Sequence, residues 1–290
     1  MKVQFSACLL SAWLCCGVPV WAQTIENPSQ TQTYSRNEFI SNLYQADIIY
    51  LGETHDRVDH HITQLEILRS LYAENPNLAI GMEMFQRPYQ EAIDRYLTGD
   101  ITEAELLEQT EYETRWGFPW ELYAPILDFA KTNGIPVIAL NAPSEALRQV
   151  AIGGFDNISA DYRDFVPPIE DLRTDNEFYR QWLKEIFDRH HQGHGSSDGF
   201  DRFFEAQVLW DETMADRIAQ FLIQNPDTQM VVLAGQGHII YGDGIPDRVD
   251  RRIPNLHHAL VLFDPDSDLP STPERPLADY IWRHDETSTP

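Results

Sequence analysis

The sequence predicts an α/β protein in which a mainly parallel sheet is flanked by helices and carries a smaller helical subdomain. Two observations lead to this prediction. Short apolar runs punctuate the 290 residues, and each is nearly continuous, as expected of strands buried on both faces of a parallel sheet. Helical periodicity fills the intervals between them, so strands and helices alternate. The apolar runs cover 47–51, 78–84, 135–140, 229–235 and 259–263.

The first 22 residues predict an export signal. Lys2 precedes an apolar stretch, and Val20-Trp21-Ala22 has the character of a small-residue cleavage site. The apolar stretch is too short to span a bilayer comfortably. We therefore expect an exported protein, periplasmic or secreted.

All three cysteines, Cys8, Cys15 and Cys16, lie within this segment. The chain that follows has no thiol, which excludes disulfides and thiolate ligands from the mature protein. A lipid anchor on one cysteine is the alternative to cleavage after Ala22, although the residues before each cysteine suit it poorly. We expect membrane association only if the protein is lipidated.

Composition divides the remaining chain into three parts. Polar residues dominate 23–45, which is expected to be a loose leader. The α/β domain should cover 46–264, with mostly helical insertions near 88–125 and 144–205. A segment rich in Pro and Asp follows at 265–290.

Individual elements follow from local patterns. Apolar residues at helical spacing begin after Asp59 and stop at Asn75-Pro76, which predicts a helix between them. Further helices are expected over 124–131 and 203–223. Near the C-terminus, 279–282 has the residues to pair at an edge of the sheet.

The formal net charge of −25 limits the partners. Binding to phosphates needs clustered Lys and Arg, so a strongly acidic chain repels nucleic acid and anionic membranes. The sequence thus argues against a nucleic-acid-binding role.

Polar side chains lie at or just after the ends of three of the apolar runs. They are Glu53 and His55, then Glu83, then His238; Asn141 follows a fourth run. In open parallel sheets, ligands bind outside the carboxyl ends of the strands. Two histidines and two carboxylates there could bind a divalent metal, or act on water as an acid–base pair. The alternative for each residue is a helix cap or a hydrogen-bonded loop side chain.

Aromatic residues gather in the segment 115–123. Such a segment can pack a helical insertion against the sheet, or it can form a wall for a flat aromatic or macrocyclic ligand. The pattern leaves both alternatives open.

Together these motifs resemble the ChaN family, haem-binding uptake proteins of the Tiki and erythromycin-esterase-like superfamily. The similarity spans about 46–263, most of the chain beyond the signal. Six strings carry it: LGETH at 51–55, GMEMFQRP at 81–88, RWGFPWELY at 115–123, IALNAP at 138–143, AQVLWDETMA at 206–215 and LAGQGHIIYG at 233–242.

The resemblance implies haem bound at the interface of a homodimer, tyrosine ligation of the iron, and a role in haem or iron uptake. A phenolate is a suitable ligand for ferric haem, and Tyr123 is the tyrosine that we expect to provide it. The wider superfamily includes metal-dependent proteases and antibiotic esterases. It therefore also implies an alternative, a metal-assisted hydrolase, an esterase or peptidase, that uses Glu53, His55, Glu83 and His238.

Overall fold

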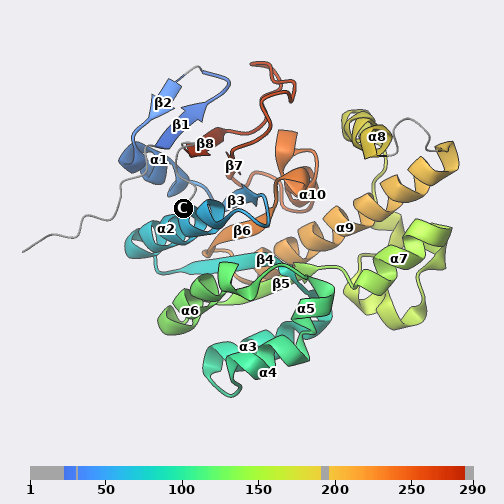
Figure 1. Ribbon diagram of the computed structural model, residues 1–290, viewed down its shortest axis with the longest axis horizontal. Helices are drawn as coiled ribbons and strands as arrows, with labels where there is room; N and C mark the ends of the chain where they lie inside the picture. The colour runs from blue at the N-terminus through green and yellow to red at the C-terminus, as the bar shows by residue number, and fades with distance from the viewer. Residues whose placement is uncertain (1–22, 31, 191–195, 285–290) are drawn as a thin grey trace, which may run out of the picture.

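The computed structural model describes residues 23–30, 32–190 and 196–284. The predicted signal segment and its cysteines lie outside the described residues. The described chain forms an eight-stranded, mostly parallel sheet with the strand order β2-β1-β8-β7-β3-β6-β4-β5 (Figure 1). The predicted α/β class is confirmed. The five predicted strands are β3 (Ile48–Glu53), β4 (Leu78–Gln86), β5 (Val137–Asn141), β6 (Gln229–Gly235) and β7 (His258–Phe263).

The central strand β3 shows why these runs are continuously apolar. It pairs in parallel with β6 on one side and β7 on the other, and all six of its residues are buried. Successive side chains point to opposite faces. Ile49 and Leu51 therefore join the core on one face, whereas Ile48 and Tyr50 join the core on the other.

Helices cover both faces of the sheet. On the face with Ile49, the core includes side chains from α1 (Arg36–Leu43), α2 (Val58–Glu74) and α6 (Ala124–Asn133). On the other face, the core includes α9 (Ser197–Gln224) and α10 (Ile245–Arg252). Among the described residues, none of these helices is long and apolar enough to cross a membrane.

The two predicted insertions are mostly helical. The first contains α3 (Gln90–Thr98), α4 (Glu103–Gln109) and α5 (Tyr112–Arg115). The second forms a subdomain with its own apolar core, made by α7 (Ser144–Gly153), α8 (Glu177–His190) and the first part of α9. Figure 1 shows this subdomain beside the sheet, joined to it by the length of α9.

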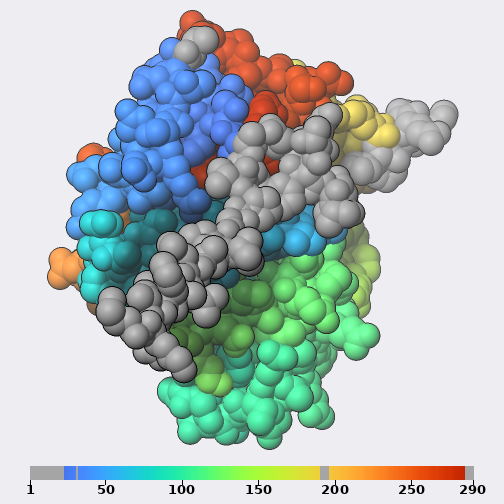
Figure 2. All heavy atoms as spheres, turned by 60° about the vertical axis from the view of Figure 1, so that its left-hand side comes forward, coloured from blue at the N-terminus to red at the C-terminus, as the bar shows by residue number. Residues whose placement is uncertain are grey.

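The segment expected to be a loose leader is ordered instead. It contains β1 (Gln23–Asn27), β2 (Gln32–Tyr34) and α1. β1 pairs antiparallel with β8 (Tyr280–His284), which confirms the predicted C-terminal edge strand. Figure 2 shows the N-terminal and C-terminal segments side by side. The polar composition was misleading because a short edge strand needs few apolar residues, and Ile25 is its one buried side chain.

A polar cluster joins this edge of the sheet to α2. The Asp264 carboxylate lies 2.8 Å from His284 Nδ1, 3.2 Å from His60 Nε2 and 3.1 Å from Arg57 Nη2. The Thr54 N–H donates to His60 Nδ1 at 3.0 Å, so the ring proton of neutral His60 is on Nε2, facing Asp264. That nitrogen has no lone pair to offer a metal. The cluster acts as a structural clamp between segments distant in sequence.

Replacing Asp264 by Asn should lower the free energy of unfolding at pH 7 by about 2–3 kcal/mol, because hydrogen bonds from three cationic or polar partners lose their charged acceptor. Asparagine tolerates the left-handed φ of 43° at this position, so the backbone should be preserved. Burial raises the pKa of Asp264, but hydrogen bonds from His284 and His60 outweigh it and lower that pKa well below its usual range.

A depressed pKa in the folded state fixes the sign of the pH dependence. The stabilisation by Asp264 should be complete above the ordinary pKa of an aspartate, near 4, and should be lost progressively as the pH falls below it. Urea unfolding at pH 7 and pH 3 tests this. The wild type and the Asp264→Asn variant should converge in stability at low pH; an equal difference at both pH values would contradict the clamp.

Candidate functional site

The carboxyl ends of β3, β4 and β6 bring the four predicted polar residues together. Glu53 ends β3, Glu83 lies in β4, and His238 follows β6 in a short 3-10 turn, Gln236–His238. They surround Gly235, whose N–H donates to Glu83 Oε2 at 2.7 Å. A Cβ at this glycine would lie 2.9 Å from His55 Nε2, so only glycine allows the ring to approach so closely.

The first part of the site is a chain of Tyr123, Glu53 and His55. The Tyr123 hydroxyl donates to Glu53 Oε1 at 2.7 Å, and His55 Nδ1 lies 2.9 Å from the same oxygen. Gln64 donates to Oε2 at 2.7 Å, so both oxygens of this buried carboxylate have partners. Because Nδ1 donates to Glu53, neutral His55 carries its lone pair on Nε2, beside Gly235.

The electrostatics of His55 suit a proton acceptor. Burial lowers the pKa of His55, but the hydrogen bond to Glu53 and the negative charges of Glu83 and Glu53 outweigh it, and the pKa is raised. Its side chain is 25% exposed, so small molecules can reach it. A histidine held by a buried carboxylate through one nitrogen, with a lone pair on the other, is a typical general base or metal ligand.

The second part of the site is a chain of Tyr179, Asp211, His238 and Glu83. Tyr179 donates to Asp211 Oδ2, and Asp211 Oδ1 lies 2.5 Å from His238 Nδ1. His238 Nε2 lies 3.3 Å from Glu83 Oε1. Burial lowers the pKa of His238, but Glu83 and Asp211 together raise it to about 10. His238 is thus a buried imidazolium at neutral pH, with both ring nitrogens facing carboxylates.

The two histidines therefore have different roles despite their similar position in sequence. Each is held at Nδ1 by a carboxylate that also binds a tyrosine hydroxyl. His238 has a second carboxylate at Nε2, whereas His55 does not. The site can thus pair a base, His55, with a fixed positive charge, His238, an arrangement that suits acid–base chemistry on water or on a carbonyl group.

A preformed metal site among the predicted residues is not present. In the part of the chain that the structure describes, one group of at least three metal-binding side chains has its ligand atoms within 4.8 Å of one another. That group is Asp59, His60, Asp264 and His284, the clamp described above. Glu53, His55, Glu83 and His238 would need to close further around an ion.

The aromatic residues of segment 115–123 mostly pack against other side chains of the protein. Trp116 and Phe118 contact His55, with ring centroids at 4.7 and 4.9 Å, and lie against the core beneath α2. Trp210 packs on His238 in the same way, at 4.8 Å. These rings shield the two histidines from bulk water and so strengthen their interactions with the carboxylates.

Tyr123 does not fit the predicted role of haem ligand. Its side chain is fully buried, its hydroxyl donates to Glu53, and burial together with the charge of Glu53 raises its pKa far above the ordinary value. An axial ligand needs an accessible oxygen, and a phenolate is strongly disfavoured here. The expectation came from the neighbouring aromatic residues, which indicate packing rather than access.

The sequence prediction missed several residues of the site. Asp211 and Tyr179 come from α9 and α8, in the helical insertion, and Gln64 comes from α2. Asp211 had no clear signal, since Glu212 and Thr213 follow it directly and the stretch is mixed polar and apolar. Tyr179 had none either, because its contact with Asp211 depends on how the subdomain packs.

Comparison with known proteins places this geometry in context. A sequence model of the family described as haem-binding uptake, Tiki superfamily, ChaN matches residues 39–249. Protein RETICULATA-RELATED 5, chloroplastic, from Arabidopsis thaliana is 28% identical over 261 residues, covering 83% of this chain and 34% of that protein. The chain spans about a third of the length of this curated relative.

Among solved structures, ChaN of Campylobacter jejuni, described with cofacial haem binding, superposes with a TM-score of 0.72 at 20% identity. The match covers 91% of this chain and 97% of that one, and it shows that the fold is shared. An erythromycin esterase in its open conformation gives a TM-score of 0.48 at 16% identity, covering 83% of this chain and 76% of that one.

Proposed function

This chain belongs to the ChaN family of haem-binding uptake proteins in the Tiki superfamily, and from this membership we propose that it binds haem and serves haem or iron uptake. The observation that carries the proposal is the family match over residues 39–249, which includes strands β3 to β6, both insertions and the strand-end residues. The protein would act as a carrier or accessory that holds haem.

The proposal includes where the protein works and with what. The signal-like residues 1–22 and the absence of cysteine beyond them support an exported protein, periplasmic or secreted. Lipidation of one of the cysteines would instead attach it to a membrane. We also propose a homodimer when haem is bound, which size-exclusion chromatography with and without haem would test.

The strand-end cluster does not fit haem as the place of binding. Glu53 and Glu83 are each 1% exposed, His238 is 7% exposed, and Tyr123 is fully buried. His55 is 25% exposed beside Gly235, which suits a small molecule rather than the face of a macrocycle. We therefore propose that haem is held by other residues of the chain.

Titration with ferric haem tests the proposed function. The purified chain should give a saturable new Soret band, with a dissociation constant in the micromolar range or below, typical of specific ligand sites. A band that grows without saturation, or no band, would refute haem binding by this protein.

A second candidate function is favoured by one observation, the pairing of a lone pair on His55 with the buried imidazolium of His238. It is a hydrolase, an esterase or peptidase, in which His55 takes a proton from water while Glu53 holds the ring in place. A divalent metal bound by His55, His238 and Glu83 would make it metal-assisted.

A panel of ester and peptide substrates, with metal analysis of protein purified without chelator, tests this candidate. Turnover should fall at least about a hundredfold in His55→Ala, since general-base catalysis contributes that much. Arg36→Ala, which removes an exposed ion pair with Glu66, serves as the matched control. Absence of both turnover and bound metal would eliminate the hydrolase.

A further inference from the structure

Between β7 and β8 the chain forms a strap, residues 270–277, that holds the loop following His238. The Tyr241 N–H donates to the Leu277 carbonyl at 2.8 Å, and the Tyr241 hydroxyl donates to the Pro270 carbonyl at 2.8 Å. The backbone of Tyr241 is left-handed, with a φ of 60°, a conformation that is unfavourable for a tyrosine. Such a backbone persists only where the surrounding structure imposes it, and these two bonds identify the strap as the part that does so.

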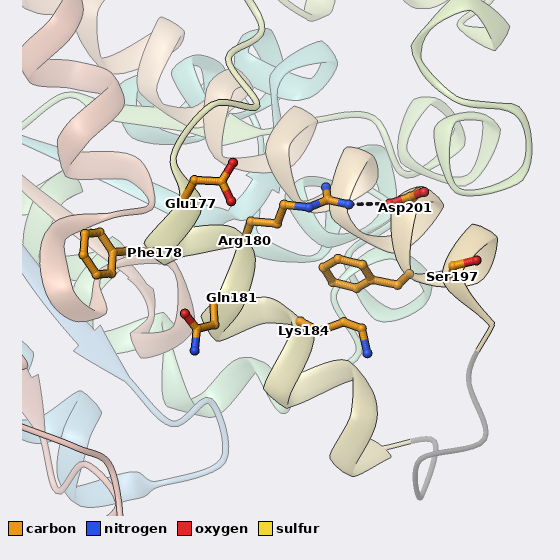
Figure 3. Close-up of a pocket in the computed structure, with 8 residues that line it drawn as sticks. Glu177, Phe178, Arg180, Gln181, Lys184, Ser197 and Asp201 are labelled. Atoms are coloured by element: carbon orange, nitrogen blue, oxygen red, sulfur yellow. Dashed lines mark hydrogen bonds and ion pairs between the residues drawn. The ribbon is translucent and has the colours of Figure 1, made fainter.

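Arg275 connects the strap to the rest of this loop and to α8. Its guanidinium forms an ion pair with Oδ2 of Asp243 and lies 4.6 Å from the ring centroid of Tyr241 and 4.5 Å from that of Phe178. Figure 3 shows Phe178 at the start of α8, on the side turned away from α9. The side-chain N–H of Asn176 donates to Oδ1 of Asp243 at 3.2 Å. The strap, the loop and the start of α8 therefore meet at one ion pair.

The loop packs directly on the hydrogen-bonded pair of His238 and Asp211. Asp243 is followed by Gly244, where an added Cβ would collide with the carbonyl group of His238 and would lie 3.1 Å from Asp211 Oδ2. The backbone thus approaches the pair as closely as a residue without a side chain allows. A displacement of Asp243 would therefore move atoms that touch both members of the pair.

Arg248 provides a second path from the loop to Asp211. It donates to the carbonyl groups of Asp243 at 2.6 Å and Gly244 at 2.9 Å, and its guanidinium lies 4.6 Å from the ring centroid of Tyr179. The hydroxyl of Tyr179 donates to Asp211. Both paths that begin at Asp243 therefore end at the same buried carboxylate.

We propose that Arg275 is a positioning residue for the strand-end network: by fixing Asp243, it holds His238 and Asp211 in the geometry of their hydrogen bond. The proposal deepens the second candidate function, on which it rests for the use of His238 as a fixed positive charge. Arg275 acts through the loop and not on a reacting atom. It lies beyond residues 39–249, which the family model matches.

The proton between His238 Nδ1 and Asp211 provides the test. A proton in a short hydrogen bond between charged groups gives a ¹H NMR resonance far downfield of the backbone amides, and it exchanges with water when the bond opens. The resonance is assigned by its absence in His238→Gln. In the full chain with Arg275→Gln, this proton should exchange at least about tenfold faster than in the wild type, because the loop is held less firmly against the pair.

Arg283→Gln is the matched control. The Arg283 side chain is 39% exposed, against 32% for Arg275, and it pairs with Glu26 on β1, outside the loop. The same substitution there should leave the exchange rate within about twofold of the wild type. Equal acceleration in Arg283→Gln and Arg275→Gln would overturn the proposal, because the effect would then be a general loss of stability.

Tyr241→Phe is the second variant, and it decides if Arg275→Gln does not fold. It removes only the hydroxyl that bonds to Pro270, and the proton should again exchange faster than in the wild type. Wild-type exchange in these variants would overturn the positioning role, even if urea unfolding showed lower stability. Absence of the downfield resonance from the wild type would overturn it as well. NMR measures no turnover, so a failure of the hydrolase is distinguished from a failure of this proposal.

Discussion

Asp211→Ala should lower the free energy of unfolding by about 3–5 kcal/mol, the largest loss that we expect from any one side chain at the strand ends. Asp211 is fully buried between the Tyr179 hydroxyl and His238 Nδ1. Its removal leaves the imidazolium of His238 with Glu83 as its one carboxylate and strands the hydroxyl of Tyr179 without an acceptor. Both defects are costly in an interior that excludes water.

The pH dependence of stability provides a second measure of the pair formed by Asp211 and His238. The pKa of folded His238 is raised to about 10, above the value near 6.5 of an unfolded histidine. Its contribution to stability should therefore be complete below about pH 6.5 and should be lost as the pH rises toward 10. In Asp211→Ala, this loss between pH 6.5 and 10 should become smaller.

Urea unfolding at pH 6, 8 and 10 measures both effects. Asp201→Asn is the control on the same helix, and its exposed pair with Arg180 should contribute less than about 1 kcal/mol. If Asp211→Ala were as stable as Asp201→Asn, the buried chain from Tyr179 to Glu83 would not contribute to the fold as described.

Glu53→Gln should lower the free energy of unfolding by about 2–4 kcal/mol. The carboxylate accepts from Tyr123 and lies beside His55 Nδ1 at one oxygen, and it accepts from Gln64 at the other. A glutamine has one acceptor oxygen, so in either orientation its NH₂ group faces a buried donor. His55 should also lose the partner that fixes its ring, and any turnover should fall with it.

Tyr123→Phe is the comparison for this variant. It removes one donor but leaves the carboxylate with Gln64 and His55. The loss in free energy of unfolding should therefore be smaller than for Glu53→Gln. Chemical unfolding at pH 7 ranks the two variants. The reverse order, with Tyr123→Phe the more destabilised, would show that ring packing rather than the carboxylate organises this end of the sheet.

The sheet and the site differ in how far they could be predicted from sequence. Strands such as β3 and β6 are buried on both faces, so their apolar runs are visible without any knowledge of neighbours. The meeting of Glu53, Glu83 and His238 was predictable for the same reason, because parallel strands end at one edge of the sheet. The edge strand β1 could not be predicted in this way, because Ile25 is its one buried side chain and the sequence therefore shows no apolar run there.

Roles within the site depend on contacts that local pattern does not contain. His55 and His238 look equivalent in sequence, and their difference arises because Asp211 and Glu83 both face His238. Tyr123 looked like a ligand because aromatic residues surround it, but those residues bury it.

We propose that this ChaN-family chain binds haem away from its buried strand-end network. Ferric haem titration of the wild type and of Tyr123→Phe tests it most directly. We predict the same saturable Soret band, at the same wavelength and with the same dissociation constant, in both proteins. No saturable band in the wild type, or a band that shifts or disappears in Tyr123→Phe, would contradict the account.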